Sequence, residues 1–241
     1  MVDYQKRFYR SRTSSPEWAS FTVQVKESDL WLRARKDLTS EAYERLYYYR
    51  HQLETYIRLF LNFKESLQPL PDDPLAPAII RAMLEAGRMA GVGPMASVAG
   101  AVAQFVGQDL MAYSPEVIVE NGGDLFIHCR EPLTVGIFAG ASPVSGRIGI
   151  HLSPSDDPRG LCTSSATVGP SLSFGKTDAA TILSPSAVLS DALASAVGNR
   201  VHTPADIQPT LDWAQQIPGV EGVLIIMGDQ VGVWGMELAA L

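Results

Sequence analysis

The stretch S-A-V-L-S-D-A-L-A-S-A-V-G-N, residues 186–199, decides how the rest of the chain is interpreted. It predicts a helix, because Ser186 is a favourable N-cap and the closing Gly-Asn pair is typical of a helix end. The residues between are mostly small or aliphatic, but one of them is the carboxylate Asp191. Asp191 and Ser195 are four residues apart, so they share one face of the predicted helix.

A carboxylate and a hydroxyl on one helix face offer two oxygen ligands to Mg²⁺. Asp191 and Ser195 are therefore our candidate metal ligands. The alternative is that Asp191 faces water and Ser195 is a small packing residue. The helix taken alone favours this alternative, because an acid is costly to bury without a partner.

The composition is that of an ordinary globular protein. The chain has 241 residues, 46% of them apolar and 19% charged. We expect a single domain over residues 1–241, with a loosely held segment at 1–20 and a Pro-rich linker at 69–77. The net charge of −7, without a long basic run, argues against nucleic acid or an anionic membrane surface as a partner.

The sequence shows neither the pattern of a signal peptide nor that of a disulfide framework. The basic start M-V-D-Y-Q-K-R is not followed by an apolar stretch, so no signal peptide is predicted. The most apolar stretch, Met89–Val106, holds Pro94 and Gln104 and is interpreted as a close-packed helix of a soluble protein. The two cysteines, Cys129 and Cys162, fit neither a disulfide framework nor a zinc site. We expect a cytoplasmic protein that does not enter a membrane.

The first third of the chain predicts a hairpin and a long helix. Phe21–Val25 and Leu30–Ala34 alternate around a polar turn, which is typical of a β-hairpin. Thr39 or Ser40 then caps a helix. Its apolar residues recur at spacings of three and four: Leu46, Tyr49, Leu53, Tyr56, Phe60, Phe63 and Leu67. Such a stripe packs against a sheet or a sister subunit, and we predict a homodimer or larger homo-oligomer.

The remainder predicts two helices, a series of strands, and two further helices before a last hairpin. Helices are expected at 78–90, 94–110, 186–199 and 204–216, with Gly91 ending the first and Pro94 opening the second. Strands are expected at 117–120, 125–129, 133–138, 148–152, 162–168, 179–183, 223–227 and 231–237. This order predicts an α+β fold, with a mostly antiparallel or mixed sheet system packed with helices.

The stretch V-I-V-E-N-G-G-D-L-F-I, residues 117–127, is the second candidate for chemistry. Asn121, Gly122 and Gly123 form a predicted tight turn, with Asp124 at its lip. Glycines leave room for backbone N–H groups to face a ligand phosphate. A plain hairpin turn is an equally good explanation of the same residues.

The third candidate is C-T-S-S-A-T-V-G-P-S-L-S-F-G-K-T-D-A-A, residues 162–180. It is rich in hydroxyls and glycine and ends near Lys176, a combination suited to a phosphate-bearing ligand. It is not a Walker A loop, because Pro170 stands where the leading glycine would be. The alternative is a Ser-rich loop between two strands.

Four motifs in order, N-G-G-D at 121–124, T-V-G-I at 134–137, C-T-S-S at 162–165 and S-A-V-L-S-D-A-L-A-S-A at 186–196, resemble those of the ApbE-like superfamily. The resemblance covers roughly residues 95–200. Within the superfamily the chain is most similar to an uncharacterised cytoplasmic branch marked by T-V-G-x-S-L-S-F-G-K-x-D-A, here residues 167–179. The superfamily includes FAD:protein FMN transferases.

The resemblance implies an ApbE-like fold and assigns roles to matching positions. Asp191 and Ser195 match the Mg²⁺ ligands of the family. The turn implies flavin-nucleotide contact through Asn121, Gly122, Gly123 and Asp124, and the A-T-S-G segment of the family matches Cys162, Thr163, Ser164 and Ser165. The chain lacks the family's H-I-x-D-P-x-T-G motif and the Lys-Gly pair before the turn, which bears on FMN transfer more than on the fold.

These observations lead to one main hypothesis and two alternatives. The main hypothesis is a protein that binds FAD, another flavin nucleotide or a similar phosphate-bearing small molecule with Mg²⁺, for flavin or nucleotidyl transfer. Asp124 and Lys176 are its candidate catalytic residues. The first alternative is an enzyme of sulfur incorporation into homocysteine, with an exposed, reactive Cys162. The second is a non-catalytic binding or assembly module that uses the long helix as its interface.

Overall fold

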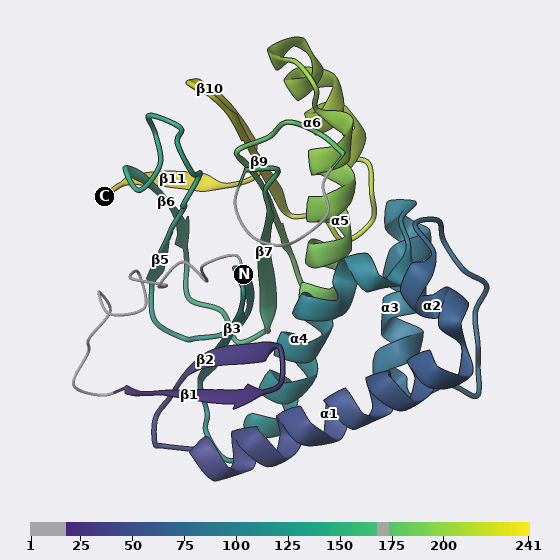
Figure 1. Ribbon diagram of the computed structural model, residues 1–241. Coiled ribbons are helices and arrows are strands. Elements are labelled where there is room, and N and C mark those ends of the chain that lie inside the picture. The colour runs from purple at the N-terminus through teal and green to yellow at the C-terminus, as the bar shows by residue number, and fades with distance from the viewer. Residues whose placement is uncertain (1–17, 168–173) are drawn as a thin grey trace.

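A computed structural model describes residues 18–167 and 174–241 of the chain (Figure 1). Its strands are β1 (Ala19–Val25), β2 (Ser28–Ala34), β3 (Val117–Asn121), β4 (Asp124–His128), β5 (Leu133–Gly136), β6 (Ile148–Leu152), β7 (Arg159–Ser164), β8 (Ala179–Ser184), β9 (Gly222–Met227), β10 (Gln230–Trp234) and β11 (Glu237–Ala240). Its helices are α1 (Thr39–Leu59), α2 (Leu61–Glu65), α3 (Ala78–Ala90), α4 (Val98–Leu110), α5 (Ala187–Arg200) and α6 (Ile207–Ala214).

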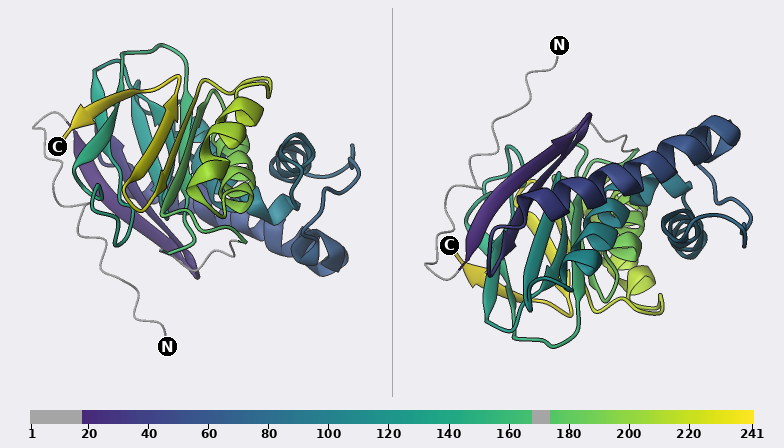
Figure 2. Two further views of the ribbon diagram at one scale, coloured as in Figure 1. Left: turned by 90° about the horizontal axis from the view of Figure 1, so that it is seen from above. Right: turned by 90° about the horizontal axis from the view of Figure 1, so that it is seen from below.

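The strands form two antiparallel sheets. Eight of them pair in the order β1-β2-β3-β4-β7-β8-β9-β10, and the other three pair in the order β11-β6-β5. The helices lie on one side of the eight-stranded sheet and the three-stranded sheet lies on the other (Figures 1 and 2). The α+β fold expected from the sequence is confirmed, and every strand pair in the described residues is antiparallel.

Two apolar cores result, because each strand of the large sheet has residues on both of its faces. The helix-side core lies between the large sheet and the helices, where α5 packs on β7 and β8 and α4 packs on β3, β4 and α5. The inter-sheet core lies between the two sheets and includes Ile118, Leu161 and Ile150. Successive side chains along a strand of the large sheet therefore enter the two cores alternately.

The N-terminal hairpin is confirmed, but the long helix is shorter than predicted. α1 ends at Leu59, where Phe60 adopts φ −132° and ψ 76°, and the short α2 follows. Phe63 is buried on α2, whereas Leu67 is 57% exposed in the segment 66–77, which contains neither helix nor strand. The apolar spacing continues across the break, which is why the sequence did not predict it. Figure 2 shows that α1 extends beyond the edge of the sheet.

Helix ends differ from prediction in several places. Leu38, not Thr39 or Ser40, is the N-cap of α1, and it makes no side-chain cap bond. α3 ends before Gly91 at φ 74°, as predicted. Pro94 opens a 3₁₀ turn, Pro94–Ser97, that leads into α4.

Further corrections concern α5 and the last two helical segments. α5 continues past its Gly-Asn pair to Arg200. The helix expected at 204–216 is a 3₁₀ turn, Pro204–Asp206, followed by α6.

No single helix among the described residues is long and apolar enough to span a membrane. α3 and residues 94–110 have that length and apolar character only when taken together, and the chain bends by 104° between them.

The strands also shift at some ends. β7 was expected at 162–168. It begins three residues earlier, at Arg159, and ends at Ser164. The expected last strand is divided, because the chain leaves the large sheet at Gly235 and β11 pairs with β6 of the other sheet. Of the segment expected to be loosely held, residues 1–17 lie outside the described residues and residues 19–20 belong to β1.

Candidate functional site

Asp191 lies where α5 crosses the start of α4. Ser186 caps α5 as predicted, its Oγ accepting a hydrogen bond from Leu189 N at 3.3 Å. Asp191 Oδ2 accepts a hydrogen bond from Gly100 N at 2.8 Å, and the Asp191 side chain is 9% exposed. Asp191 therefore faces the amides at the N-terminal turn of α4, where a negative charge is favourable.

This contact requires a glycine at position 100. A Cβ added to Gly100 would lie 2.2 Å from Ala187 O and 2.8 Å from Asp191 Cβ. Both distances are far inside van der Waals contact, so no other residue allows α4 and α5 to approach this closely. Size is therefore decisive at Gly100, and it is also restricted at Gly107 of the same helix, where an added Cβ would lie 2.2 Å from Phe126 Cδ1.

Asp124 lies beside Asp191. It begins β4 opposite Cys162 of β7, and it faces the helices with Phe126. Burial, followed by the negative charge of Asp191, raises the pKa of Asp124 well above its usual range. Burial raises the pKa of Asp191 to about 7, although hydrogen bonds from the Gly100 and Ala99 amides oppose the shift. The structure thus brings Asp124 and Asp191 together.

One oxygen of this pair has no hydrogen-bond partner among the described residues, although Cys162 and the Thr163 amide interact with the carboxyl group of Asp124. Asp124 Oδ1 is buried and makes no hydrogen bond to any described residue. A buried carboxylate oxygen without a donor is costly, and two neighbouring acids disfavour each other's ionised forms. The pair is therefore either partly protonated or balanced by a cation.

The Gly-Gly turn that precedes Asp124 contacts the N-terminal turn of α4. Asn121 Nδ2 donates to Ala99 O at 3.1 Å, which joins the turn to α4. Gly122 and Gly123 have φ of 71° and 111°, values that favour glycine. Gly123 N donates to Glu120 Oε1 at 3.2 Å, so this amide has a partner within the protein.

Hydroxyl groups continue the site along α5. Asp191, Ser195 and Gly198 follow at spacings of four and three, so they share a helix face. A Cβ added to Gly198 would lie 3.4 Å from Thr177 Oγ1 and 3.7 Å from Ser164 Oγ. Thr177 is fully buried, and its hydroxyl has no partner among the described residues. The residues of this site, here named the polar strip, are Asp124, Ser164, Thr177, Asp191 and Ser195.

The structure does not place every predicted residue in the polar strip. Thr163 alternates with Cys162 and Ser164 and faces the inter-sheet core, where its Oγ1 lies 2.9 Å from Thr181 Oγ1. Ser165 Oγ accepts a hydrogen bond from Thr167 N at 3.1 Å. Lys176 is exposed, and its backbone N donates to Val201 O at 2.9 Å. Residues 168–173 of the same loop lie outside the described residues.

The oxygen atoms of the polar strip fit a divalent cation that is completed by a ligand. Within the described residues, no three His, Cys, Asp or Glu side chains gather to hold a metal by themselves. Mg²⁺ does not need such a cage, because it is usually held by one or two carboxylates together with waters and substrate phosphates. Asp124 and Asp191 are neighbouring carboxyl groups, and Asp124 Oδ1 has no hydrogen-bond partner among the described residues, so the side chains present would suit such a cation.

Cys162 is not the exposed thiol that the sulfur-chemistry alternative expects. Both cysteines are buried, and Cys162 is 0% exposed with its Sγ donating to Ala187 O at 3.3 Å. Burial raises the pKa of the Cys162 thiol, as do the charges of Asp124 and Asp191. A buried neutral thiol is a poor nucleophile. The alternative thereby loses the group that it needs.

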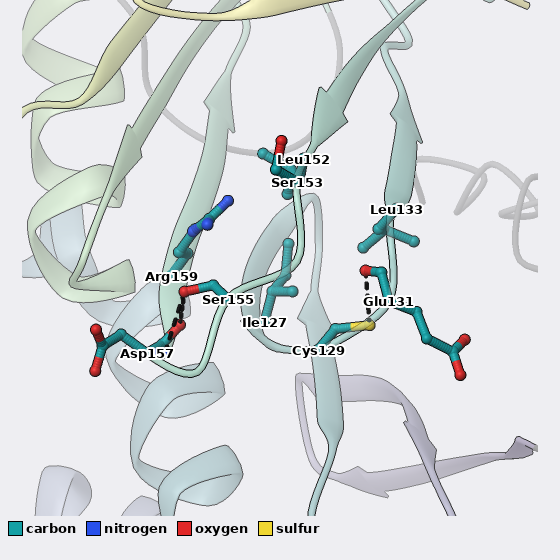
Figure 3. A pocket seen from close by; sticks show the side chains of 9 residues that line it. All are labelled: Ile127, Cys129, Glu131, Leu133, Leu152, Ser153, Ser155, Asp157 and Arg159. Atoms are coloured by element: carbon teal, nitrogen blue, oxygen red, sulfur yellow. Dashed lines mark hydrogen bonds between the residues drawn. The ribbon is translucent and has the colours of Figure 1, made fainter.

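Two cavities lie away from the polar strip, toward the inter-sheet core. The smaller, of about 10 Å³, is shown in Figure 3, where Cys129 and Glu131 lie on one side and Asp157 and Arg159 on the other. The larger has about 160 Å³ and shares Cys129, Glu131 and Leu133 with it. Neither is lined by a residue of the polar strip.

Sequence reasoning missed Gly100 and Thr177. Gly100 stands in a run of small residues in which nothing marks it from its neighbours, and its role depends on how α4 meets α5. Thr177 is one of many hydroxyls in its loop. Its full burial beside Gly198 follows only from the packing of that loop on α5.

Comparison with known proteins gives consistent matches. The model of the family described as "AbpE bacteria" matches residues 10–232. A UPF0280 protein of Methanocella arvoryzae is 38% identical over 213 residues, covering 88% of this chain and 86% of the relative. A UPF0280 protein of Methanothrix thermoacetophila is 41% identical over 189 residues, covering 77% and 78%.

Solved structures share the fold at low identity. The ApbE protein of Thermotoga maritima has a TM-score of 0.52 and 11% identity, covering 89% of this chain and 96% of its own. The flavinyl transferase ApbE of Pseudomonas stutzeri, in its apo form, has a TM-score of 0.56 and 12% identity, covering 90% and 93%. At such low sequence identity, these structural matches show a shared fold.

Proposed function

This chain belongs to the ApbE-like superfamily, together with the UPF0280 proteins, and from this premise we propose that its polar strip binds the phosphate groups of a flavin nucleotide. FAD is the first candidate, and another phosphate-bearing small molecule of similar size is the second. The observation that carries the proposal is the buried, unpartnered Oδ1 of Asp124 beside Asp191. A flavinyl transferase of the same fold supports the choice of flavin.

Each residue of the polar strip has a distinct role in this proposal. Asp191 and Ser195 would hold Mg²⁺, which when bound neutralises phosphate charge, and Asp124 lies beside them as the proposed base. The hydroxyls of Ser164 and Thr177 would donate to phosphate oxygens, which gives the buried Thr177 hydroxyl a partner. The Gly122–Gly123 turn leaves open space next to β7, since a Cβ at Gly123 would meet only Thr163 O, at 3.9 Å.

The proposed reaction class is transfer of a flavin-bearing phosphoryl group to a hydroxyl. The acceptor oxygen forms a bond to phosphorus as the pyrophosphate P–O bond breaks, and the nucleoside monophosphate leaves. Asp124 is the proposed acceptor of the hydroxyl proton, because burial and the charge of Asp191 raise its pKa and so make its carboxylate more basic. Lys176, exposed at the end of the loop, remains a proposed second catalytic residue that would approach the bound phosphates from solvent.

Binding of FAD tests this proposal directly. Titration of the full chain with FAD is expected to show saturable binding that is strengthened by MgCl₂. Asp124→Asn keeps the shape of the side chain and removes its charge, so Mg²⁺-dependent affinity should fall at least about tenfold, or about 1.4 kcal/mol. Asp212→Asn, on the exposed side of α6, is the matched control and should bind as the parent does. Absence of saturable FAD binding, or equal affinity in the two variants, would contradict the proposal.

Self-association is a second proposal, and it rests on exposed apolar residues of α1, α2 and the segment after them. These residues, here named the α1–α2 patch, are Tyr43, Tyr47, Tyr48, Leu59, Phe60, Leu61 and Leu67. All are about half exposed or more, and α1 extends past the sheet edge, where a second copy could cover it (Figure 2). Tyrosine and phenylalanine are enriched at protein interfaces relative to the rest of the surface.

Light scattering at micromolar concentration is expected to give at least the mass of a homodimer. Leu61→Glu should shift the mass toward the monomer, because it places a charge in the α1–α2 patch. Val231→Glu makes the same kind of change on the edge strand β10, where Val231 is 41% exposed, and should leave the mass unchanged. A monomeric parent would refute self-association, and dissociation by Val231→Glu alone would assign the interface to β10 instead.

A further inference from the structure

A cavity of about 160 Å³ lies at the rim between the two sheets. Arg33 and Ile118 line it from β2 and β3, and Leu133 lines it from the start of β5. Arg33 and Ile118 alternate along their strands with residues of the helix-side core, so they face away from the polar strip. The cavity is therefore separated from the proposed flavin site by the large sheet itself.

Arg33 brings a buried positive charge to this cavity. Burial lowers the pKa of Arg33 and the nearby charge of Glu131 opposes this shift, but among the described residues no acid forms an ion pair or hydrogen bond with its guanidinium. The residue is 6% exposed, and its Nε makes no hydrogen bond to the described residues. Within the same residues, Arg33 forms no salt bridge. A buried charge without a counter-ion is costly, so such a guanidinium is expected to have a partner.

Glu131, the acid that lines this cavity, already pairs with another arginine, Arg35. Glu131 lines the cavity, but its Oε1 accepts a hydrogen bond from Arg35 Nη2, and the same nitrogen pairs with Glu116. The Trp18 ring lies within 5.1 Å of the Arg33 guanidinium carbon and 4.6 Å of that of Arg35. The Trp18 ring thus lies beside the Arg33 guanidinium, which forms no ion pair with a described residue. Sites that bind an anionic group with an apolar body combine a cation and an aromatic ring in this way.

We propose that this cavity binds a small organic carboxylate, whose charged group pairs with Arg33 and whose apolar body lies against Trp18, Ile118 and Leu133. A planar guanidinium matches a carboxylate with two parallel hydrogen bonds. An apolar cavity of about 150 Å³ holds one benzene molecule, so the available 160 Å³ suits a ring-sized ligand. One unpaired cation, with Glu131 nearby, favours a single negative charge over a phosphate dianion.

The smaller hollow of Figure 3 adjoins this site. It shares Cys129, Glu131 and Leu133 with the larger cavity and has about 10 Å³, room for about one water. A ligand in the larger cavity would thus be sized to one ring, with little space to extend further toward β6.

Benzoate and benzyl alcohol test the proposal, because they share a ring and differ in charge. Titration of the full chain with benzoate is expected to raise the thermal midpoint in a saturable way and to change tryptophan fluorescence through Trp18. Benzyl alcohol should have at least a tenfold weaker effect. An equal response to both compounds, or no response to benzoate, would overturn the proposal.

Arg33→Met removes the charge and keeps much of the side-chain volume. Without ligand this variant should be as stable as the parent or more stable, because an unpaired buried charge is gone, and its benzoate affinity should fall at least tenfold. Arg81→Met, on the exposed face of α3, is the matched control and should keep the parent's affinity. Unchanged benzoate affinity in Arg33→Met would refute the role of Arg33.

Leu133→Phe keeps the proposal testable if Arg33→Met does not fold. The larger side chain fills the cavity and leaves the guanidinium in place, so the benzoate response should be lost while FAD binding is unaffected. Retained benzoate binding in this variant would place the ligand elsewhere on the protein and refute the site. Loss of FAD binding together with benzoate binding would refute the separation of the two sites.

Discussion

Replacement of Gly100 by alanine is expected to lower the free energy of unfolding by about 3 kcal/mol, in the upper part of the range for overpacked cores. The added Cβ would lie 2.2 Å from Ala187 O, a backbone atom that cannot move without shifting α5. The higher helix propensity of alanine offsets only about 1 kcal/mol of the strain. For a chain of this length the thermal midpoint should fall by roughly 6–12 °C.

Gly198→Ala is the matched control, because it makes the same change inside a helix that faces the same site. Its Cβ would meet Thr177 Oγ1 at 3.4 Å, an ordinary contact. The variant should be as stable as the parent or more stable by up to about 1 kcal/mol. Equal stability of the two variants in urea unfolding would show that α4 and α5 do not require glycine where they cross.

The second large effect concerns pH and the pair Asp124–Asp191. The pKa of Asp191 is about 7 in the folded protein, above the usual value of 3.8. Between about pH 4 and pH 7 the folded protein holds a proton that the unfolded chain has released, so the free energy of unfolding falls as the pH rises. From pH 5 to pH 8 the metal-free protein should lose at least about 2 kcal/mol.

Asp191→Asn should flatten this dependence. Asparagine keeps a carbonyl oxygen for the Gly100 amide, removes one titrating acid and relieves the charge repulsion on Asp124. The variant should therefore be more stable than the parent at pH 8, when no divalent cation is present. Asp212→Asn should retain the parent's slope, and a parallel slope in Asp191→Asn would show that the buried pair does not control it.

Mg²⁺ gives the same experiment a second readout. The cation competes with protons for the two carboxylates, so it should raise the stability of the parent more at pH 8 than at pH 5. Asp191→Asn should lose most of this stabilisation, because Mg²⁺ depends on carboxylate charge. An equal Mg²⁺ effect in the parent and in Asp191→Asn would rule out a metal role for Asp191 while leaving its contact with α4 intact.

Much of the fold could be predicted because its signals are local. α3 has a clear apolar face and ends at a glycine with positive φ, so its bounds match prediction. The end of α1 was missed because apolar spacing continues through Phe60, although the backbone there leaves the helix. The division of the last strand was missed because the turn at Gly235 depends on Glu221, whose carbonyl oxygen lies 2.1 Å from an added Cβ.

The site could be predicted only in part, for a similar reason. A turn before Asp124 and a helix face at Asp191 were visible as motifs, and the fold brings the two acids together. Which hydroxyl of β7 faces them was not visible, because a shift of one residue sends Ser164 to one face and Thr163 to the other. The cavity at Arg33 left no sequence signal, since its walls come from strands far apart in the chain.

The pairing of β11 with β6 sets the order in which the protein can be assembled during synthesis. Without β11, β5 and β6 form only a two-stranded hairpin, which is marginally stable in water. At 5–20 residues per second, the roughly 85 residues between β6 and β11 take about 4–17 s to appear. For that time Ile150 and Leu152 lack a completed three-stranded sheet, so these apolar strand residues stay less protected from water until β11 is made.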